Sequence, residues 1–446
     1  MRVANPRIVL KFDPVASCDL LGATLIPWIF LVVTSVGAAF TANAFWPMGD
    51  HRRFFVPSFL FSWLTMELAA HHLVWQALAT WLFWELGAME AWPGWAGLGL
   101  SVLSWGGLAG LIIEGRRARG VVHRALSRAA IREPAHRFPW RSLLIPFPIA
   151  EARARRSKDI VYRRVAGREL ELDVYTPDGR RHLRPAIVQV HGGAWVMGDK
   201  REQGIPLLVH LCQQGWVGFN VNYRLSPGAT FPDQLVDLKA ALAWIREHAE
   251  DFGVDPNFIA VTGGSAGGHL AALLALTANR PEYQPDFESA DTSVQACVPL
   301  YAVFDLTNRL GARKAKYVDG FIGPVLIKAF FDEEPEKFHA GSPTDQIHAS
   351  APPFFVIHGD RDTMTPLEDA RLFVERLRDT SKSPVLFAEI GGAQHAFDVF
   401  LSPRSAPVIE GVCAFLVDQH QAYLARATAT PLPAAPSVEA SARRPS

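Results

Sequence analysis

The sequence predicts an α/β domain with a mostly parallel, helix-covered sheet, preceded by an N-terminal region of transmembrane helices. Three observations support this prediction. Nearly uncharged apolar stretches fill most of the first 115 residues. From about Ile160, short β-branched runs alternate with helical patterns, which is typical of a parallel sheet with helices on both faces. A serine flanked by glycines stands between one such run and an Ala/Leu-rich helix.

The composition suits a chain that is partly embedded in a membrane and names no soluble partner. Hydrophobic residues make up 49% of the chain, and the formal net charge is zero. The cysteines are too far apart for a metal site or a redox pair, and we expect isolated thiols and neither metal nor cofactor. The pattern changes along the chain predict five segments: an N-terminal tail (1–19), a membrane region (20–115), a basic amphipathic linker (116–158), the α/β domain (159–425) and a disordered Ala/Pro-rich tail (426–446).

The membrane region contains three apolar stretches. Leu20–Trp46 is almost free of charge and exceeds the roughly 20 residues that span a bilayer. A signal peptide is the alternative, because an Ala-Asn-Ala sequence resembles a cleavage site. Phe54–Trp84 is one long tilted helix or a short re-entrant piece followed by a helix, and its Glu67 should face protein or the interface. With Trp92–Ile113 we expect three spans, and two are the alternative.

Basic residues in the short flanks predict the orientation. Arg52 and Arg53 follow the first stretch, and an arginine-rich run follows the third, so both flanks are expected in the cytoplasm. Basic residues in the N-terminal tail argue for the opposite orientation. We therefore expect a multi-pass plasma-membrane protein with an outside N-terminus and a cytoplasmic α/β domain. The basic linker is expected to lie on anionic lipid headgroups. A solvated linker is the alternative, and nucleic-acid binding is disfavoured directly after a span.

Six short apolar runs between Arg184 and Gly392 predict buried strands, and Pro232–Phe252 and Pro366–Thr380 predict helices between them. Segment 305–350 interrupts this rhythm. It is either an apolar cap over the site or an ordinary helical layer on the sheet. The six predicted strands are RPAIVQV, WVGFNVNY, NFIAVTGG, VQACVPLY, PFFVIHG and PVLFAEIGG.

The candidate nucleophile is Ser265, in the pattern G-x-S-x-G. Gly263 and Gly267 allow a sharp strand-to-helix turn that presents the serine outward, and the following helix N-terminus favours developing negative charge. Because a serine hydroxyl is a poor nucleophile at neutral pH, it needs an oriented base. In such a fold the order is serine, acid, histidine. That order predicts His395 as the base and leaves Asp360 and Asp362 as candidate acids. Asp362 lies further into the loop past the strand end, where a carboxylate can reach across the sheet edge, so we expect Asp362 as the acid and Asp360 as a turn residue.

Three other titratable residues compete for these roles. His269 lies inside the helix after the serine and is expected to be a packing residue. His358 ends a strand and is expected to stabilise the acid loop. Asp398 is too close to His395 in sequence to be the favoured orienting acid.

The motifs HGGAW, NYRLSP, FPDQLVDLKAALAWI, GGSAGG, HGDRD and GAQHAF together resemble α/β-hydrolases of the esterase/lipase type. The closest resemblance is to hormone-sensitive-lipase-like and bacterial feruloyl-esterase-like branches. It covers about Ile160 to Leu424, and implies an α/β-hydrolase fold and ester hydrolysis by Ser265, Asp362 and His395. The N-terminal spans resemble those of membrane-anchored mycobacterial esterases.

Two departures from this pattern leave alternatives open. Ala194 replaces a third glycine and Trp195 follows it, which also resembles kynurenine formamidases, and Gly264 replaces an aspartate. An ester hydrolase acting on hydrophobic substrates is the main expectation. A formamidase-type amide hydrolase and a non-enzymatic membrane scaffold are the alternatives, although a complete triad argues against a scaffold. The sequence makes no prediction of the oligomeric state.

Backbone N–H groups are expected to bind the oxyanion. The predicted donors are those of Gly192, Gly193 and Ala266. His191 precedes the serine and so falls outside the expected chain order. We expect it to support the glycine loop by a hydrogen bond rather than to react.

Overall fold

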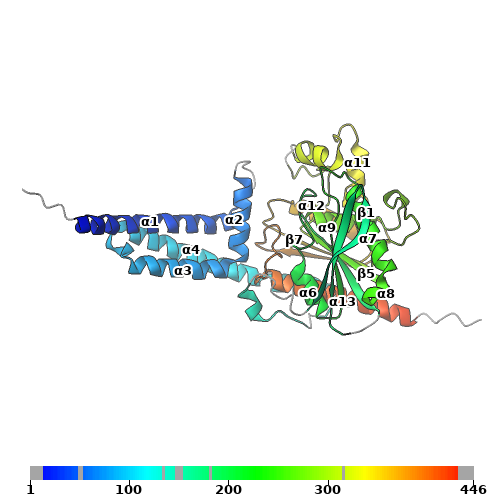
Figure 1. The fold of residues 1–446 in the computed structure, drawn as a ribbon, viewed down its shortest axis with the longest axis horizontal. Coiled ribbons are helices and arrows are strands. Elements are labelled where there is room, and N and C mark those ends of the chain that lie inside the picture. Colours follow the sequence, from blue (N-terminus) through cyan, green and yellow to red (C-terminus); the bar gives the residue numbers. More distant parts are fainter. Residues whose placement is uncertain are drawn as a thin grey trace, which may run out of the picture.

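The computed structural model describes residues 14–48, 54–132, 136–145, 154–179, 183–313 and 317–429. A rod of helices extends from one side of a globular α/β domain (Figure 1). Helix α1 begins inside the predicted N-terminal tail, and α13 ends inside the predicted C-terminal tail. The remainder of both tails lies outside the described residues. The same holds for Arg52 and Arg53, on which the orientation depends.

The rod is built from α1, α3 and α4, which run along one another, while α2 lies across their end beside the α/β domain (Figure 1). Among the described residues, two segments, Leu25–Phe45 and Trp92–Arg128, are long and apolar enough to cross a membrane. The stretch 54–84 breaks at Leu68, so the expected short piece followed by a helix is found, and one long helix is not. The rod helices are α1 (Pro14–Phe45), α2 (Phe55–Glu67), α3 (Ala69–Glu85), η1 (Ala88–Glu90) and α4 (Trp92–Arg116).

The α/β domain contains one eight-stranded sheet in the order β1-β2-β4-β3-β5-β6-β7-β8. All six predicted strands are present, and they pair in parallel. The antiparallel hairpin β1–β2 was not predicted, and it begins inside the segment expected to be linker. The strands are β1 (Arg155–Val165), β2 (Arg168–Thr176), β3 (Arg184–Val190), β4 (Val217–Val221), β5 (Val254–Gly264), β6 (Ala296–Leu300), β7 (Phe354–Gly359) and β8 (Val385–Ile390).

Helices cover both faces of the sheet and enclose two hydrophobic cores. One core lies under α7, α9 and α12, and the other lies under α5, α6 and α13. Helix α5 belongs to the predicted linker, yet its side chains Val122 and Leu126 are buried. The linker is therefore partly packed onto the domain. The helices are α5 (Ala118–Arg128), η2 (Trp140–Leu143), α6 (Ile205–Cys212), α7 (Asp233–Glu247), α8 (Ala249–Phe252), α9 (Ala266–Leu276), η4 (Pro281–Tyr283), α12 (Leu367–Thr380) and α13 (Ser405–Ala429).

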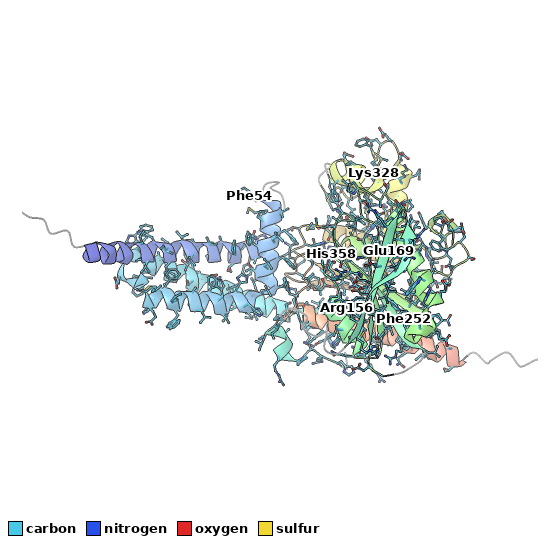
Figure 2. All side chains as sticks on the ribbon, in the orientation of Figure 1. Phe54, Arg156, Glu169, Phe252, Lys328 and His358 are labelled. Carbon is cyan, nitrogen blue, oxygen red and sulfur yellow. The ribbon has the colours of Figure 1, made fainter. Side chains whose placement is uncertain are left out.

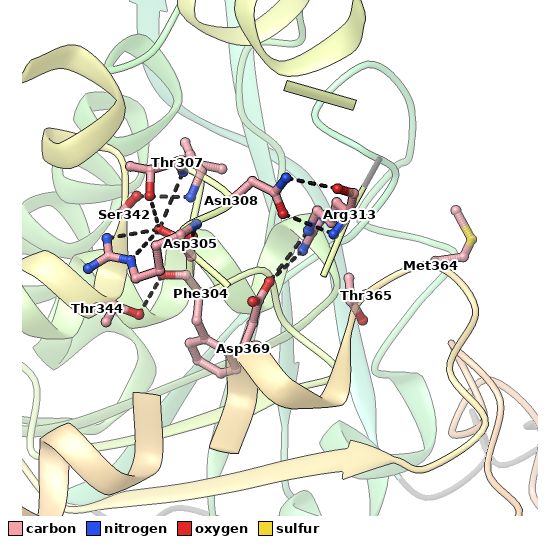
Figure 3. A network of polar contacts seen from close by, with 12 residues as sticks. Phe304, Asp305, Thr307, Asn308, Arg313, Ser342, Thr344, Met364, Thr365 and Asp369 are labelled. Carbon is pink, nitrogen blue, oxygen red and sulfur yellow. Dashed lines mark hydrogen bonds and ion pairs between the residues drawn. The ribbon is translucent and has the colours of Figure 1, made fainter. Parts of the chain in front are cut away.

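Segment 305–350 forms a helical lobe of η5 (Val318–Ile327), α11 (Pro335–Ala340) and η6 (Pro343–Asp345). Its side chains Ile322, Leu326 and Phe338 are fully buried in the core under α7, α9 and α12. A polar network fixes the start of the lobe. Arg313 pairs with Asp369 (Figure 3), and Arg309 bridges Asp305 and Asp345. The network thus ties the start of the lobe to Asp345 at its end and to Asp369 on α12.

Salt bridges join the helical rod to the α/β domain. Glu67, at the end of α2, is only 3% exposed and pairs with the buried Arg404, which confirms that it faces protein. Ser402 donates to the same carboxylate at 2.6 Å. On α4, Glu114 accepts two hydrogen bonds from Arg361, at 2.9 and 3.0 Å. In Figure 2, His358 on β7 lies on the side of the domain that faces α2.

Candidate active site

Ser265 occupies a sharp turn between β5 and α9. Its backbone has φ 59° and ψ −125°, a combination that side chains disfavour and that persists only where the surroundings enforce it. The neighbouring glycines permit the turn. A Cβ on Gly263 would lie 2.6 Å from the backbone of Gly267, and a Cβ on Gly267 would lie 2.2 Å from the carbonyl oxygen of Val190. The two predicted glycines are therefore required by close backbone contacts.

His395 and Asp362 form a hydrogen-bonded pair beyond the ends of β7 and β8. His395 Nδ1 donates to Asp362 Oδ2 at 2.7 Å. The other oxygen of Asp362 accepts from the N–H groups of Met364 and Thr365, both at 2.8 Å, and the Thr365 hydroxyl donates to Oδ2 at 2.8 Å. Burial alone would raise the pKa of Asp362, but His395 and these hydrogen bonds hold the pKa below its usual value. A permanent carboxylate thus orients the imidazole.

The two competing acids have other contacts. Asp360 accepts the N–H of Gly392 at 2.7 Å and so braces the turn that leads to His395, as expected of a turn residue. Asp398 accepts the hydroxyl proton of Tyr301. Burial is the first cause of a raised pKa for both carboxyls. Neither residue contacts His395 through a hydrogen bond among the described residues.

Tyr301 connects the serine turn with the histidine. Its ring lies edge-on to the His395 imidazole, with 4.7 Å between centroids. A Cβ on Gly264 would lie 2.4 Å from the Tyr301 hydroxyl, so the glycine in place of the family's aspartate makes room for this ring. In the part of the chain that is described, no hydrogen bond joins Ser265 Oγ to His395. Such bonds are often long without substrate and tighten on binding.

The glycine loop after β3 lies against the serine. A Cβ on Gly192 would be 3.1 Å from Ser265 Cβ. Its N–H, however, donates to Gln203 Oε1 at 2.8 Å, so the predicted role of Gly192 as a free oxyanion donor is not met. The N–H of Gly193 has no partner among the described residues. That of Ala266 opens α9, where first-turn N–H groups lack partners within the helix.

His191 shapes this loop. Its Nδ1 donates to the carbonyl oxygen of Gly192 at 2.8 Å, and its ring stacks on Tyr223 with 4.4 Å between centroids. The Tyr223 hydroxyl donates to the His191 carbonyl at 2.9 Å. Burial lowers the pKa of His191, which keeps the ring neutral. These contacts match the expected supporting role.

The other two histidines are also held by protein contacts. His269 accepts a hydrogen bond from Trp195 Nε1 at 3.2 Å and donates to the carbonyl of Gly341 at 2.7 Å. Burial lowers its pKa to about 4, so it is a neutral packing residue, as predicted. His358 donates to the carbonyl of Thr365 at 3.0 Å, which confirms its place against the acid loop.

Three residues with clear roles in this geometry were not predicted. Thr365, seen beside the polar network in Figure 3, fixes Asp362. Gln394 Oε1 accepts from the N–H groups of Thr363 at 2.8 Å and of His395 at 3.0 Å, and so ties the acid loop to the histidine loop. Tyr301 flanks the imidazole. Of these three residues, only Gln394 could have been identified from the sequence, because it directly precedes the candidate base.

The chain is similar to named esterases. The family model BD-FAE matches residues 172–377. Esterase LipQ of Mycobacterium tuberculosis is 45% identical over 267 residues, which cover 59% of this chain and 62% of LipQ. The probable carboxylic ester hydrolase LipM of the same organism is 44% identical, over 56% of this chain and 59% of LipM. The chain thus spans about three fifths of the length of these curated relatives.

A solved esterase has the same fold. The thermophilic esterase Est2 of Thermogutta terrifontis superposes with a TM-score of 0.50 at 26% identity, over 61% of this chain and 92% of Est2. Residues 172–377 thus match the BD-FAE family model, and the α/β domain is similar in fold to a solved esterase.

Proposed function

We propose that this protein is a membrane-anchored serine carboxylesterase. The observations that carry the proposal are the Asp362–His395 pair, with 2.7 Å between Oδ2 and Nδ1, and Ser265 on its strained turn between β5 and α9. Ser265 is the nucleophile, His395 the general base and Asp362 the acid that orients it. This arrangement hydrolyses an ester through a covalent acyl-enzyme.

The reaction follows from the positions of these groups. As Ser265 Oγ attacks the carbonyl carbon, its proton passes to His395 Nε2, and Asp362 stabilises the imidazolium. The N–H groups of Gly193 and Ala266 stabilise the oxyanion, and such a donor contributes about 3–4 kcal/mol. His395 then protonates the leaving alcohol as the ester C–O bond breaks. A water molecule, deprotonated by His395, hydrolyses the acyl-enzyme and restores Ser265.

The names of the relatives favour an ester over a formamide. LipQ and LipM are named as ester hydrolases. The resemblance to formamidases rested on Trp195, and this side chain is only 1% exposed and bonded to His269. A packing role accounts for the tryptophan in H-G-G-x-W, so no observation on the site favours the formamidase.

The surface of the rod supports membrane insertion. Large apolar side chains are exposed on α1, α3 and α4, an arrangement that is costly in water. Trp28 packs on Trp92 at the end far from the α/β domain, and Trp46, 75% exposed, marks the near end. At 1.5 Å per residue, these two levels are about 27 Å apart along α1, close to a bilayer core. The exposed apolar side chains include Ile29, Val32, Val36, Val74, Leu78, Val102, Leu103 and Ile113.

Helix α2 has the polarity expected at a membrane surface. Its small polar residues Ser58, Ser62 and Thr65 are buried, whereas Val56 and Leu60 are exposed. This is the reverse of a helix on a soluble protein. An apolar outer face lying parallel to the bilayer plane fits the interface. Three long antiparallel helices put the α/β domain and the N-terminus on opposite sides, and the arginine-rich α5 favours a cytoplasmic domain beside anionic headgroups.

Hydrolysis by the purified full-length protein in detergent tests the proposal. Nitrophenyl esters of rising chain length, with formylkynurenine alongside, are compared between wild type and Ser265→Ala. We expect ester hydrolysis that extends to long acyl chains and is lost in the variant. Activity confined to the shortest chains contradicts the hydrophobic substrate, and preferential hydrolysis of formylkynurenine contradicts the esterase. A reporter fused after Ser446 and found outside the cell contradicts the orientation.

A further inference from the structure

The helix that lies across the end of the rod reaches the candidate base. The ring of Phe59, on α2, lies edge-on to the His395 imidazole with 6.3 Å between centroids. Tyr301 flanks the same imidazole at 4.7 Å. The base thus lies between one aromatic ring from the catalytic domain and one from the membrane region. Phe59 is half-buried, so part of its ring is open to a ligand.

A buried hydrogen-bond chain runs from α2 to the backbone of the base. Gln394 Nε2 donates to Ser62 Oγ at 3.1 Å, and Ser62 donates its own proton to the carbonyl of Phe59 at 2.9 Å. Gln394 Oε1 accepts from the N–H of His395 at 3.0 Å. Ser62 and Gln394 are both fully buried, where an unmatched polar group is costly. Ser62 therefore fixes the amide that holds His395.

A second hydrogen bond from α2 fixes the other side of the base. Trp63 Nε1 donates to the carbonyl of Ala396 at 2.9 Å. Ala396 has φ 60°, a conformation disfavoured for a residue with a side chain, and surrounding contacts must maintain it. Trp63 also packs on Phe400 with 4.9 Å between centroids. The α2 helix thus holds the residues immediately before and after His395.

The docking of α2 is itself fixed by ion pairs. Glu67 pairs with Arg404 in a buried site, where losing either partner leaves an uncompensated charge. On the neighbouring α4, Glu114 holds Arg361 through two hydrogen bonds, and Arg361 directly precedes Asp362. Both loops that carry the Asp–His pair are therefore tied to the helical rod.

We propose that α2 is part of the catalytic centre: Ser62 and Trp63 are positioning residues for His395, and Phe59 forms the membrane-side wall of the substrate site. The face of α2 turned away from the buried Ser58 and Ser62 exposes Val56 and Leu60, so an ester with an apolar chain meets α2 at the bilayer surface before it reaches the serine. This inference rests on the proposed esterase function and adds that the membrane region sets both the geometry of the base and the preference for long chains.

The positioning role is tested with full-length protein in nanodiscs. Trp63→Phe and Ser62→Ala are compared with matched substitutions on the rod, Trp81→Phe and Ser35→Ala, whose residues are exposed. The assay measures kcat, KM and pH dependence on a short, soluble nitrophenyl ester, and a fluorophosphonate titrates the reactive serines. We expect kcat of each α2 variant to fall about fivefold, as for one lost hydrogen bond, with KM and the titrated fraction unchanged.

Two outcomes overturn the positioning role. One is a kcat for both α2 variants equal to that of their controls. The other is a loss of activity that merely follows the loss of titratable serines, since that reports misfolding. A double variant Ser62→Ala with Gln394→Leu, which removes both partners of the hydrogen bond, should retain the titratable serine yet lose further kcat, because the N–H of His395 then lacks its acceptor.

The wall role is tested by chain-length preference. Phe59→Ala is expected to lower the ratio of kcat/KM for long over short esters about tenfold, the scale of a lost apolar contact in a pocket. Leu78→Ala, an exposed leucine on the rod helix α3, is the matched control and should leave that ratio unchanged. Equal ratios in both variants overturn the wall. If the wild type neither hydrolyses esters nor reacts with fluorophosphonate, the esterase proposal itself fails. If the wild type is active and the α2 variants are equally active, only the role of α2 is rejected.

Discussion

Replacing Asp362 with asparagine is expected to preserve the fold and to lower kcat about 10⁴-fold, the effect of the same change in a serine-protease triad. The side chain is isosteric, and its carbonyl oxygen can still accept from the N–H groups of Met364 and Thr365, which lie 2.8 Å from Oδ1. The amide nitrogen then takes the place of Oδ2. In the wild type, Oδ2 accepts a hydrogen bond from His395 Nδ1 at 2.7 Å. The amide nitrogen of the variant can only donate a hydrogen bond at this position.

The consequence concerns the tautomer of His395. If Nδ1 must accept a hydrogen bond, the proton of the neutral ring moves to Nε2, the nitrogen that has to receive the proton of Ser265. The loss of base and of imidazolium stabilisation corresponds to about 5.5 kcal/mol at 1.36 kcal/mol per tenfold change. The carboxylate is fully buried, so solvent cannot replace it.

The assay is kcat on a soluble nitrophenyl ester together with the rate of fluorophosphonate labelling. Circular dichroism confirms that the variant is folded. Asp360→Asn is the matched control, because Asp360 accepts from Gly392 N–H and an amide oxygen can keep that bond. We expect the control to remain within a few-fold of wild type, and an Asp362→Asn variant within tenfold of wild type would refute the reasoning.

Three further predictions concern stability and local packing. His269 has a pKa lowered to about 4 by burial, so the unfolded chain binds more protons below pH 6.5 and stability falls from there toward about pH 4. In thermal unfolding, His269→Asn should lose less stability than wild type as the pH falls through this range. An identical dependence of stability on pH in the two proteins contradicts this prediction. Glu67→Leu should destabilise the protein by about 3–5 kcal/mol, and adding Arg404→Leu should recover most of it in denaturant unfolding; no recovery contradicts the buried pair. Gly264→Ala would bring a Cβ to 2.4 Å from the Tyr301 hydroxyl, and kcat should fall about 100-fold, as for a misplacement of about 1 Å; unchanged kcat shows that Tyr301 moves freely.

The strands and the acid–base pair were predictable because their signals are local. Six apolar runs bounded by turns predicted the parallel strands, and the position of Asp362 further into its loop favoured it over Asp360. The hairpin β1–β2 was not predicted from the sequence, because β1 lies at the exposed edge of the sheet and is rich in charged residues. Lys200, fully buried, pairs with Asp159 and Glu171 of this hairpin, which no local pattern reveals.

Contacts between residues far apart in the sequence could not be predicted either. The sequence indicated that Glu67 needed a protein partner but not that the partner is Arg404, 337 residues later. It likewise gave the glycines of the oxyanion loop but not Gln203, which occupies the Gly192 N–H. Hydrogen-bond partners brought together by folding leave no mark in spacing or periodicity. The placement of α2 beside His395 is the most consequential of these.

Labelling of the intact protein by a fluorophosphonate, with mass-spectrometric location of the adduct, tests the central claim most directly. We expect one adduct, on Ser265, formed quickly by wild type, absent in Ser265→Ala and strongly slowed in Asp362→Asn. An adduct on another residue, or equal labelling of wild type and Ser265→Ala, would contradict it.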